Sequence, residues 1–155
     1  MLKEALAISL LGIFALSSRA ADPERSYVAP PKAADRPAPP YSEAVMAGET
    51  LYVAGHIGFD SATSRVPANV DDEIRLVLDG VKQTLEKAGL KTDDLVSVTV
   101  YCTDLELFDK FNTIYRTYFH GQFPARAFIG VNKLLAGAHF EVAGTAVKTP
   151  GTRKM

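Results

Sequence analysis

The pattern of apolar and polar positions predicts two strands and a helix in the first half of the folded region. Short apolar runs at residues 44–47 and 50–54 are separated by a Gly-Glu pair, which is typical of a hairpin. Between Asn69 and Gly89, apolar residues recur every three or four positions behind an acidic first turn. Asn69 and Gly89 suit the two caps of a helix, so we expect a helix between them.

The second half of the chain repeats the alternation of strands and helices. Residues 95–102 alternate apolar and polar side chains and predict a strand with one apolar face. Residues 106–119 carry an aromatic stripe at helical spacing, which we interpret as core packing rather than as a cofactor site. Two further strands are expected at about 126–131 and 138–148. The order β-β-α-β-α-β-β predicts a single α+β domain, in which two helices cover one face of a mixed sheet.

The N-terminal segment lies outside this predicted domain. Residues 1–20 hold a basic residue, a short apolar run and then small residues, as a signal peptide with cleavage near Ala20/Ala21 would. The run would reach only about 18 Å as a helix, too short to span a bilayer. Residues 21–40 contain six of the nine prolines and predict an extended Pro-rich linker before a domain at 41–150. We therefore expect a periplasmic or secreted protein with no membrane anchor after cleavage.

Composition narrows the possible partners. The 155 residues contain 17 Lys and Arg against 18 Asp and Glu, a formal net charge of −1, and no basic cluster. This balance argues against nucleic acid and anionic membranes as partners. The three histidines and the single cysteine show no metal-ligand spacing, so no metal site is predicted. Cys102 falls on the apolar face of its strand and is expected to be an inert core residue.

The candidate chemistry rests on two charged residues in the C-terminal strands. The sequence holds no phosphate-binding loop, nucleophile elbow or zinc-protease motif. Arg126 enters an otherwise apolar strand, and a guanidinium in such a place usually meets a carboxylate. Alternation puts Glu141 on the strand face opposite Phe140. If the last two strands form a hairpin, Arg126 and Glu141 either form a salt bridge that orders the sheet or share a ligand site.

Several segments, in their order and spacing, resemble the RidA family, also called YjgF/YER057c/UK114. The resemblance covers about residues 41–148. The matching segments are Tyr41, residues 51–57, Lys87-Ala88-Gly89-Leu90, residues 98–105, Phe111-Asn112 with Tyr115 and Phe119, Phe123-Pro124-Ala125-Arg126, and Glu141 fifteen residues later.

The resemblance implies a chorismate-mutase-like fold and a homotrimer with ligand clefts between subunits. It also implies hydrolysis of reactive enamines and 2-imino acids to 2-keto acids and ammonia, with no cofactor. By correspondence, Arg126 would hold the substrate carboxylate and Glu141 would place the water. Tyr41 and Asn112 would line the cleft. These roles suit an imine, whose carbon is already electrophilic when protonated.

Three residues depart from the family pattern at the predicted pocket. Ala54 replaces a small hydroxyl residue, His56 replaces a Gln, and Phe128 replaces a frequent Cys. Phe128 favours a bulkier or more apolar imine, and His56 is interpreted as a hydrogen-bonded substitute for the Gln. The departures also leave open a non-catalytic trimer that binds small carboxylates. A ribonuclease or translation inhibitor is less favoured, because the chain is acidic and lacks a basic stripe.

Overall fold

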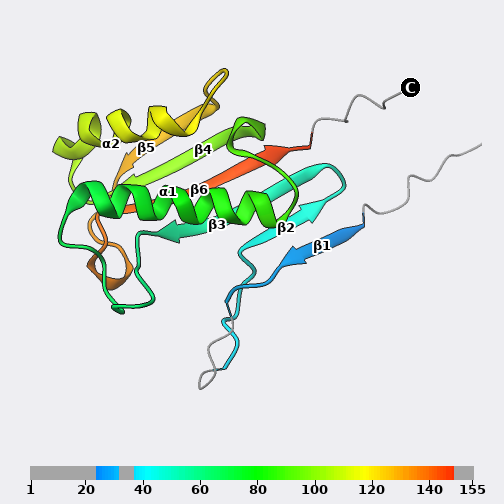
Figure 1. The fold of residues 1–155 in the computed structure, drawn as a ribbon, viewed down its shortest axis with the longest axis horizontal. Coiled ribbons are helices and arrows are strands. Elements are labelled where there is room, and N and C mark those ends of the chain that lie inside the picture. Colours follow the sequence, from blue (N-terminus) through cyan, green and yellow to red (C-terminus); the bar gives the residue numbers. More distant parts are fainter. Residues whose placement is uncertain (1–23, 32–36, 149–155) are drawn as a thin grey trace, which may run out of the picture.

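The computed structural model describes residues 24–31 and 37–148, which form one sheet and two helices (Figure 1). In chain order the elements are β1 Arg25–Val28, β2 Ala44–Ala47, β3 Thr50–Ile57, α1 Val70–Lys87, β4 Leu95–Cys102, α2 Phe108–Tyr115, β5 Ala125–Gly130 and β6 Phe140–Val147. Single 3₁₀ turns precede and follow α2.

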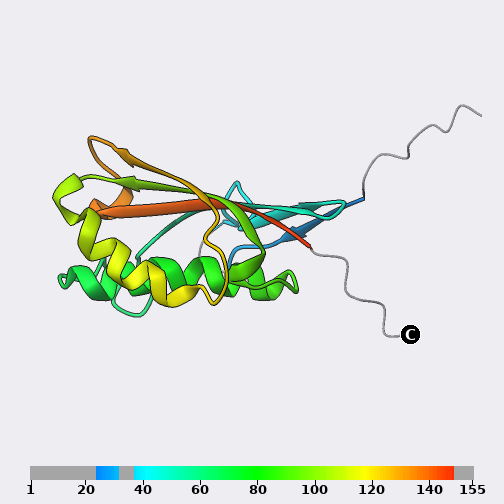
Figure 2. The ribbon, with the colours of Figure 1, turned by 90° about the horizontal axis from the view of Figure 1, so that it is seen from above.

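The six strands have the order β1-β2-β3-β6-β4-β5. All neighbours are antiparallel except β4 and β5, which are parallel and are connected through α2. Seen from above, both helices lie on one face of the sheet (Figure 2). The predicted α+β fold, with a mixed sheet covered by two helices on one face, is therefore confirmed.

Strand β1 is a correction to the predicted linker. It lies within residues 21–40 and pairs with β2 at the edge of the sheet. The reason is local: Pro23 and Pro30 flank the strand, and no proline interrupts it. An edge strand also needs hydrogen bonds on one side only, which tolerates prolines at its ends. The predicted signal peptide lies outside the described residues, and within the described part of the chain no helix is long and apolar enough to cross a membrane.

The last two strands do not form the hairpin on which the approach of Arg126 and Glu141 was conditional. Strand β4 lies between β5 and β6, because β6 pairs with both β3 and β4. Burial explains this placement: Phe140, Val142 and Ala146 of β6 are at most 1% exposed and need the central position beneath the helices. Strand β5 is only partly buried and occupies the edge.

The core lies between the helices and the sheet. Ile74, Val77, Val81 and Leu85 of α1 are at most 4% exposed and form its sheet-facing side. The predicted N-cap of α1 is confirmed, since the Asn69 side chain accepts a hydrogen bond from the backbone N–H two residues on. The C-cap is Ala88, and Gly89, predicted as the cap, follows it with a φ of 76°. In α2 the stripe residues Phe111 and Tyr115 are buried as expected. Cys102 is also buried, and burial raises its pKa.

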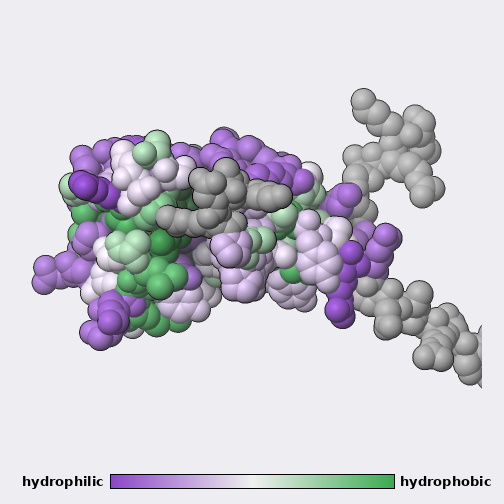
Figure 3. All heavy atoms as spheres, turned by 90° about the horizontal axis from the view of Figure 1, so that it is seen from below, coloured by the Kyte–Doolittle hydropathy of each residue, from purple (hydrophilic) through white to green (hydrophobic). Residues whose placement is uncertain are grey.

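No described helix covers the sheet face opposite α1 and α2. Tyr52 and Val147 are 55% and 37% exposed and adjoin buried residues on their strands, and Ile129, which follows the half-buried Phe128, is 41% exposed. Viewed from below, hydrophobic side chains also gather at the end of the molecule where the loops after β3 and β5 lie (Figure 3). Contiguous exposed apolar surface of this kind usually marks an interaction site.

Candidate functional site

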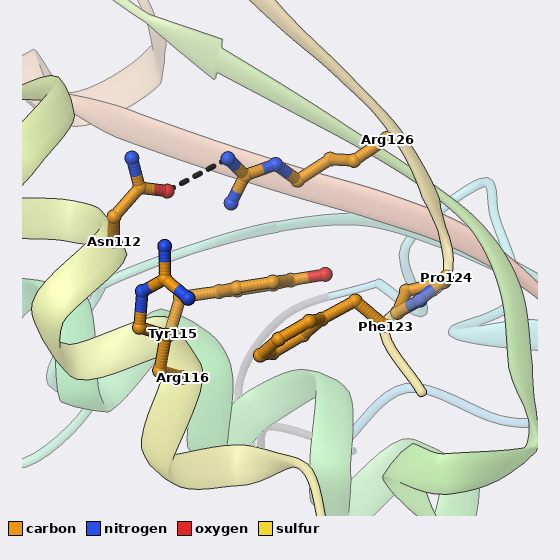
Figure 4. A pocket seen from close by; sticks show the side chains of 6 residues that line it. All are labelled: Asn112, Tyr115, Arg116, Phe123, Pro124 and Arg126. Atoms are coloured by element: carbon orange, nitrogen blue, oxygen red, sulfur yellow. Dashed lines mark hydrogen bonds between the residues drawn. The ribbon is translucent and has the colours of Figure 1, made fainter. Parts of the chain in front are cut away.

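The candidate site forms where β5 faces α2, with Arg126 at its centre (Figure 4). Alternation along β5 turns Arg126 and Phe128 toward α2. The Arg126 Nη2 donates a hydrogen bond of 2.7 Å to Oδ1 of Asn112, and the guanidinium carbon lies 4.6 Å from the centre of the Tyr115 ring. A neutral amide and an aromatic face thus orient the guanidinium and leave its charge uncompensated.

A cavity of about 200 Å³ opens beside this guanidinium. It is lined by Asn112, Tyr115, Arg116, Phe123, Pro124 and Arg126 (Figure 4). In the described ranges, neither Arg116 nor Arg126 has a carboxylate oxygen within 4.0 Å. The cavity is therefore positively charged and is suited to a small anion, because a guanidinium fork matches the geometry of a carboxylate.

Tyr115 lines the cavity, and its hydroxyl is buried. The residue is 4% exposed, and its Oη is buried without a hydrogen-bond partner among the described residues. Burial raises the pKa of Tyr115 to about 12, and the charge of Arg126 lowers it in part. The hydroxyl therefore keeps its proton at neutral pH and can donate a hydrogen bond.

Glu141 lies on the other face of the sheet. Its neighbours Phe140 and Val142 are buried beneath the helices, so the half-buried Glu141 points to the uncovered side. The carboxylate lies directly over Gly55 of β3, where an added Cβ would overlap Oε1 and come within 2.9 Å of Cδ. Gly55 therefore provides the space that the Glu141 side chain occupies.

One chain does not bring Arg126 and Glu141 together. Arg126 is opposite Val98 on one side of β4, and Glu141 is opposite Tyr101 on the other side. This register separates their backbones by about 10 Å along the strands and about 10 Å across them. The expectation that the two side chains approach each other within the sheet is wrong, because β4 intervenes and they point to opposite faces.

His56 lies beneath α1 and away from the Arg126 cavity. A β-bulge between Val53 and His56, at Ala54-Gly55, turns the imidazole toward the helix, where its Nε2 is 3.2 Å from the Thr84 Oγ1. Burial lowers the pKa of His56 below 6.5, with Glu43 opposing the shift and Lys87 adding to it. The position suits the interpretation of His56 as a hydrogen-bonded replacement and does not suit a pocket residue of the same chain. Ala54 is half-buried at the bulge and does not line the cavity.

The remaining predicted pocket residues divide between the site and its surroundings. Asn112 lines the cavity, as predicted. Phe128 does not line the cavity and instead packs edge-on against Phe108 and Phe111, at centroid distances of 4.9 and 5.5 Å. Its ring centre lies 5.7 Å from the guanidinium carbon of Arg126. Tyr41 precedes β2, is 57% exposed and is not part of the cavity wall.

Arg116 is a cavity residue that the sequence reasoning missed. A basic residue near a helix C-terminus ordinarily interacts with the helix dipole and with solvent, so its position alone did not indicate that Arg116 belongs to a binding site. Its spacing from Asn112 is four residues, which places both side chains on one face of the helical segment. This four-residue spacing from the predicted site residue Asn112 is the sequence feature that could have identified Arg116.

Comparison with known proteins agrees with this geometry. The model of the family described as endoribonuclease L-PSP matches residues 32–148. A 2-iminobutanoate/2-iminopropanoate deaminase of Mus musculus is 37% identical over 112 residues, covering 72% of this chain and 83% of the relative. A RutC family protein of Pyrococcus horikoshii is 38% identical over 116 residues, covering 74% of this chain and 92% of the relative.

Solved structures show the same fold. The YjgF gene product from E. coli superposes with a TM-score of 0.68 at 35% identity, covering 71% of this chain and 89% of that one. E. coli TdcF with bound serine superposes with a TM-score of 0.72 at 29% identity, covering 80% of this chain and all of that one. Because the family model spans most of the chain and the fold is shared, the protein belongs to the RidA/YjgF family, whose members include 2-imino acid deaminases.

Proposed function

We propose that the protein hydrolyses 2-imino acids to 2-keto acids and ammonia. The observation that carries this proposal is the Arg126 guanidinium, which Asn112 orients in a cavity of small-molecule size and which has no carboxylate partner in the described part of the chain. The family relationship to 2-iminobutanoate/2-iminopropanoate deaminases supplies the reaction class. Arg126 binds the substrate carboxylate in this proposal.

The proposed site is completed by a second copy of the chain in a homotrimer. Within one chain, Arg126 and Glu141 point to opposite faces of the sheet. The uncovered face carries Glu141 together with exposed apolar residues such as Tyr52 and Ile129, which suit packing against another copy. Arg126 lies on the edge strand β5, where a neighbouring chain can bring its own Glu141 to the same substrate.

The chemistry needs only positioning and one proton acceptor. Arg126 fixes the carboxylate, and water adds to the electrophilic carbon of the protonated imine to form a C–O bond. Glu141 accepts the proton that the water loses and returns it to the nitrogen. The C–N bond then breaks while the proton of the added hydroxyl passes to the departing nitrogen, so that one protonated imine and one water give one 2-keto acid and one ammonium ion, with no oxidation or reduction.

Imine loss in the presence of an amino-acid oxidase tests the proposal. The oxidase generates 2-imino acids of graded side-chain size in situ, and the purified protein is expected to accelerate their hydrolysis. Arg126→Ala should abolish the acceleration, while circular dichroism and light scattering show that fold and assembly persist. An Arg126→Ala variant as active as the wild type would refute the proposal. If no imine is accelerated, the cavity is a binding site for small carboxylates without turnover.

Subunit complementation tests the shared site. Arg126→Ala and Glu141→Ala chains, each inactive alone, are unfolded in urea, mixed and refolded together. A site that takes Arg126 from one chain and Glu141 from another is intact at some interfaces of a mixed oligomer, so activity should return in part. If the mixture does not recover activity although light scattering shows assemblies, Arg126 of one chain and Glu141 of another do not act together in one site.

We also propose that residues 1–20 direct export. The sequence pattern described above is the support for this location. Cell fractionation of the full chain and of a chain that lacks residues 2–20 tests it, with the full chain expected outside the cytoplasm. Equal cytoplasmic retention of both chains would refute it.

A further inference from the structure

Two arginines, not one, line the cavity. Arg116 from the turn after α2 and Arg126 from β5 both contribute to the cavity of about 200 Å³. Both also line an adjoining, wider opening of about 600 Å³, together with Asp109. Figure 4 shows the two guanidinium groups near Asn112, at the same side of the cavity. The smaller cavity therefore has two cationic groups in its wall and no acidic one, whereas the wider opening has a single carboxylate.

Neither guanidinium is paired with a carboxylate among the residues that the structure describes. Arg126 is bound by the neutral amide of Asn112. The guanidinium carbon of Arg116 lies 5.6 Å from the centre of the Phe123 ring, and no carboxylate oxygen of the described residues is within 4.0 Å of it. Two like charges that face one small cavity repel each other, and an anion with two acidic groups would relieve that repulsion. One monocarboxylate would satisfy only Arg126.

The polar groups of the wall set the ligand chemistry. The Tyr115 residue lines the cavity, but its hydroxyl oxygen is buried from solvent and from the cavity. The polar groups that remain for a ligand are the guanidinium groups of Arg116 and Arg126 and the amide of Asn112. Two guanidinium forks match the oxygen atoms of two carboxylates.

We propose that the preferred substrates are dicarboxylic 2-imino acids, with Arg126 on the carboxylate next to the imine and Arg116 on the side-chain carboxylate. This assignment rests on the proposed function and names its substrate class. It differs from the expectation of an apolar imine, because Phe128 lies behind Arg126 and Arg116 lies in the wall. The hydrolysis itself is unchanged: one water enters, one ammonia leaves and both carboxylates are retained.

Imines from aspartate and asparagine give a matched pair of substrates. They share one carbon skeleton and differ only in a carboxylate against a neutral amide. The wild type is expected to favour the aspartate-derived imine in kcat/KM by at least about tenfold, the effect of one charged hydrogen-bonded contact. Arg116→Gln should lower this ratio by about tenfold, and Arg116→Lys should retain part of it. Lys82→Gln removes a surface cation of α1 and should leave the ratio unchanged.

A binding measurement separates failure of this inference from failure of the deaminase proposal. Calorimetric titration of wild type and Arg116→Gln with succinate and with succinamate needs no turnover. Preference for succinate that Arg116→Gln removes would support the dicarboxylate site even if no imine were hydrolysed. Hydrolysis without preference for the aspartate-derived imine, or equal binding of succinate and succinamate, would overturn the inference and leave the deaminase proposal standing.

Discussion

Removal of the Glu73 carboxylate should destabilise the fold more than its position in the first turn of a helix suggests. Glu73 lies on α1 and is completely buried. Its Oε1 accepts hydrogen bonds from the backbone N–H groups of His139 at 2.6 Å and Phe140 at 3.1 Å. Its Oε2 is 2.7 Å from Nδ1 of His139. One side chain of the helix therefore anchors the start of β6, the strand that carries Glu141.

The magnitude follows from the bonds that would be lost. Glu73→Ala leaves two backbone donors and one ring nitrogen unpaired, of which the N–H of Phe140 is fully buried. At about 1–2 kcal/mol for each of the three bonds to this acceptor, the loss in the free energy of unfolding is about 3–6 kcal/mol. Glu73→Gln keeps one oxygen for both backbone N–H groups, and its amide can donate to Nδ1 when the proton is on Nε2. Its cost is expected to be about 1 kcal/mol.

Urea unfolding followed by circular dichroism measures these losses. All variants are compared at one protomer concentration, because assembly would couple stability to concentration. Asp72→Ala is the matched control, since Asp72 is exposed in the same helical turn and contributes only about 0.3–1 kcal/mol through the helix dipole. If Glu73→Ala unfolds within about 1 kcal/mol of Asp72→Ala, the anchoring role of the carboxylate is refuted.

Three further substitutions test single features of the structure. Gly55→Ala places a Cβ where the Glu141 carboxylate lies, so imine hydrolysis should fall by about tenfold or more with the fold retained; an unchanged rate would contradict the placement of Glu141. Gly89→Ala should cost about 1–2 kcal/mol in urea unfolding, because φ is 76° and no atom lies within 4 Å of the added Cβ, so that only backbone strain acts. Burial lowers the pKa of His56 in the folded chain. Below pH 6.5 the unfolded chain therefore takes up a proton that the folded chain does not. The free energy of unfolding of the wild type should fall as the pH drops below 6.5. His56→Gln should weaken this pH dependence. If the free energy of unfolding falls equally with pH in both proteins, His56 is not its source.

Local signals sufficed where one element determines its own structure. The Asn69 cap, the apolar spacing through Leu85 and the left-handed Gly89 delimit α1 without reference to the rest of the chain. The alternation from Leu95 to Tyr101, with Cys102 on the apolar face, likewise predicted β4, except that a register shift between Leu95 and Ser97 leaves Val96 48% exposed. Both predictions depend on interactions between residues a few positions apart, which the sequence displays directly.

Long-range pairing decided the features that could not be predicted. The position of β6 between β3 and β4 depends on which strand needs the greatest burial, and no local pattern specifies it. The bulge at Ala54-Gly55 reverses the inward and outward alternation of β3, so His56 faces α1. Glu73 looked like a residue that favours a helix N-terminus. Its role as an anchor for β6 appears only when α1 and the start of β6 are adjacent.

The alternation that builds the core also separates the two candidate catalytic groups. On β5 the helix-facing positions hold Arg126 and Phe128, whereas on β6 they hold Phe140 and Val142, so Glu141 faces away. Glu141 could face the helices, as Arg126 does, only if a bulge shifted the alternation of β6 by one residue. The register shifts of the described sheet lie instead between Leu95 and Ser97 of β4 and at Ala54-Gly55 of β3, where Gly55 lies beneath Glu141. A reaction that needs both groups must therefore obtain one of them from a second chain, which makes complementation between Arg126→Ala and Glu141→Ala a test of the geometry as well as of the chemistry.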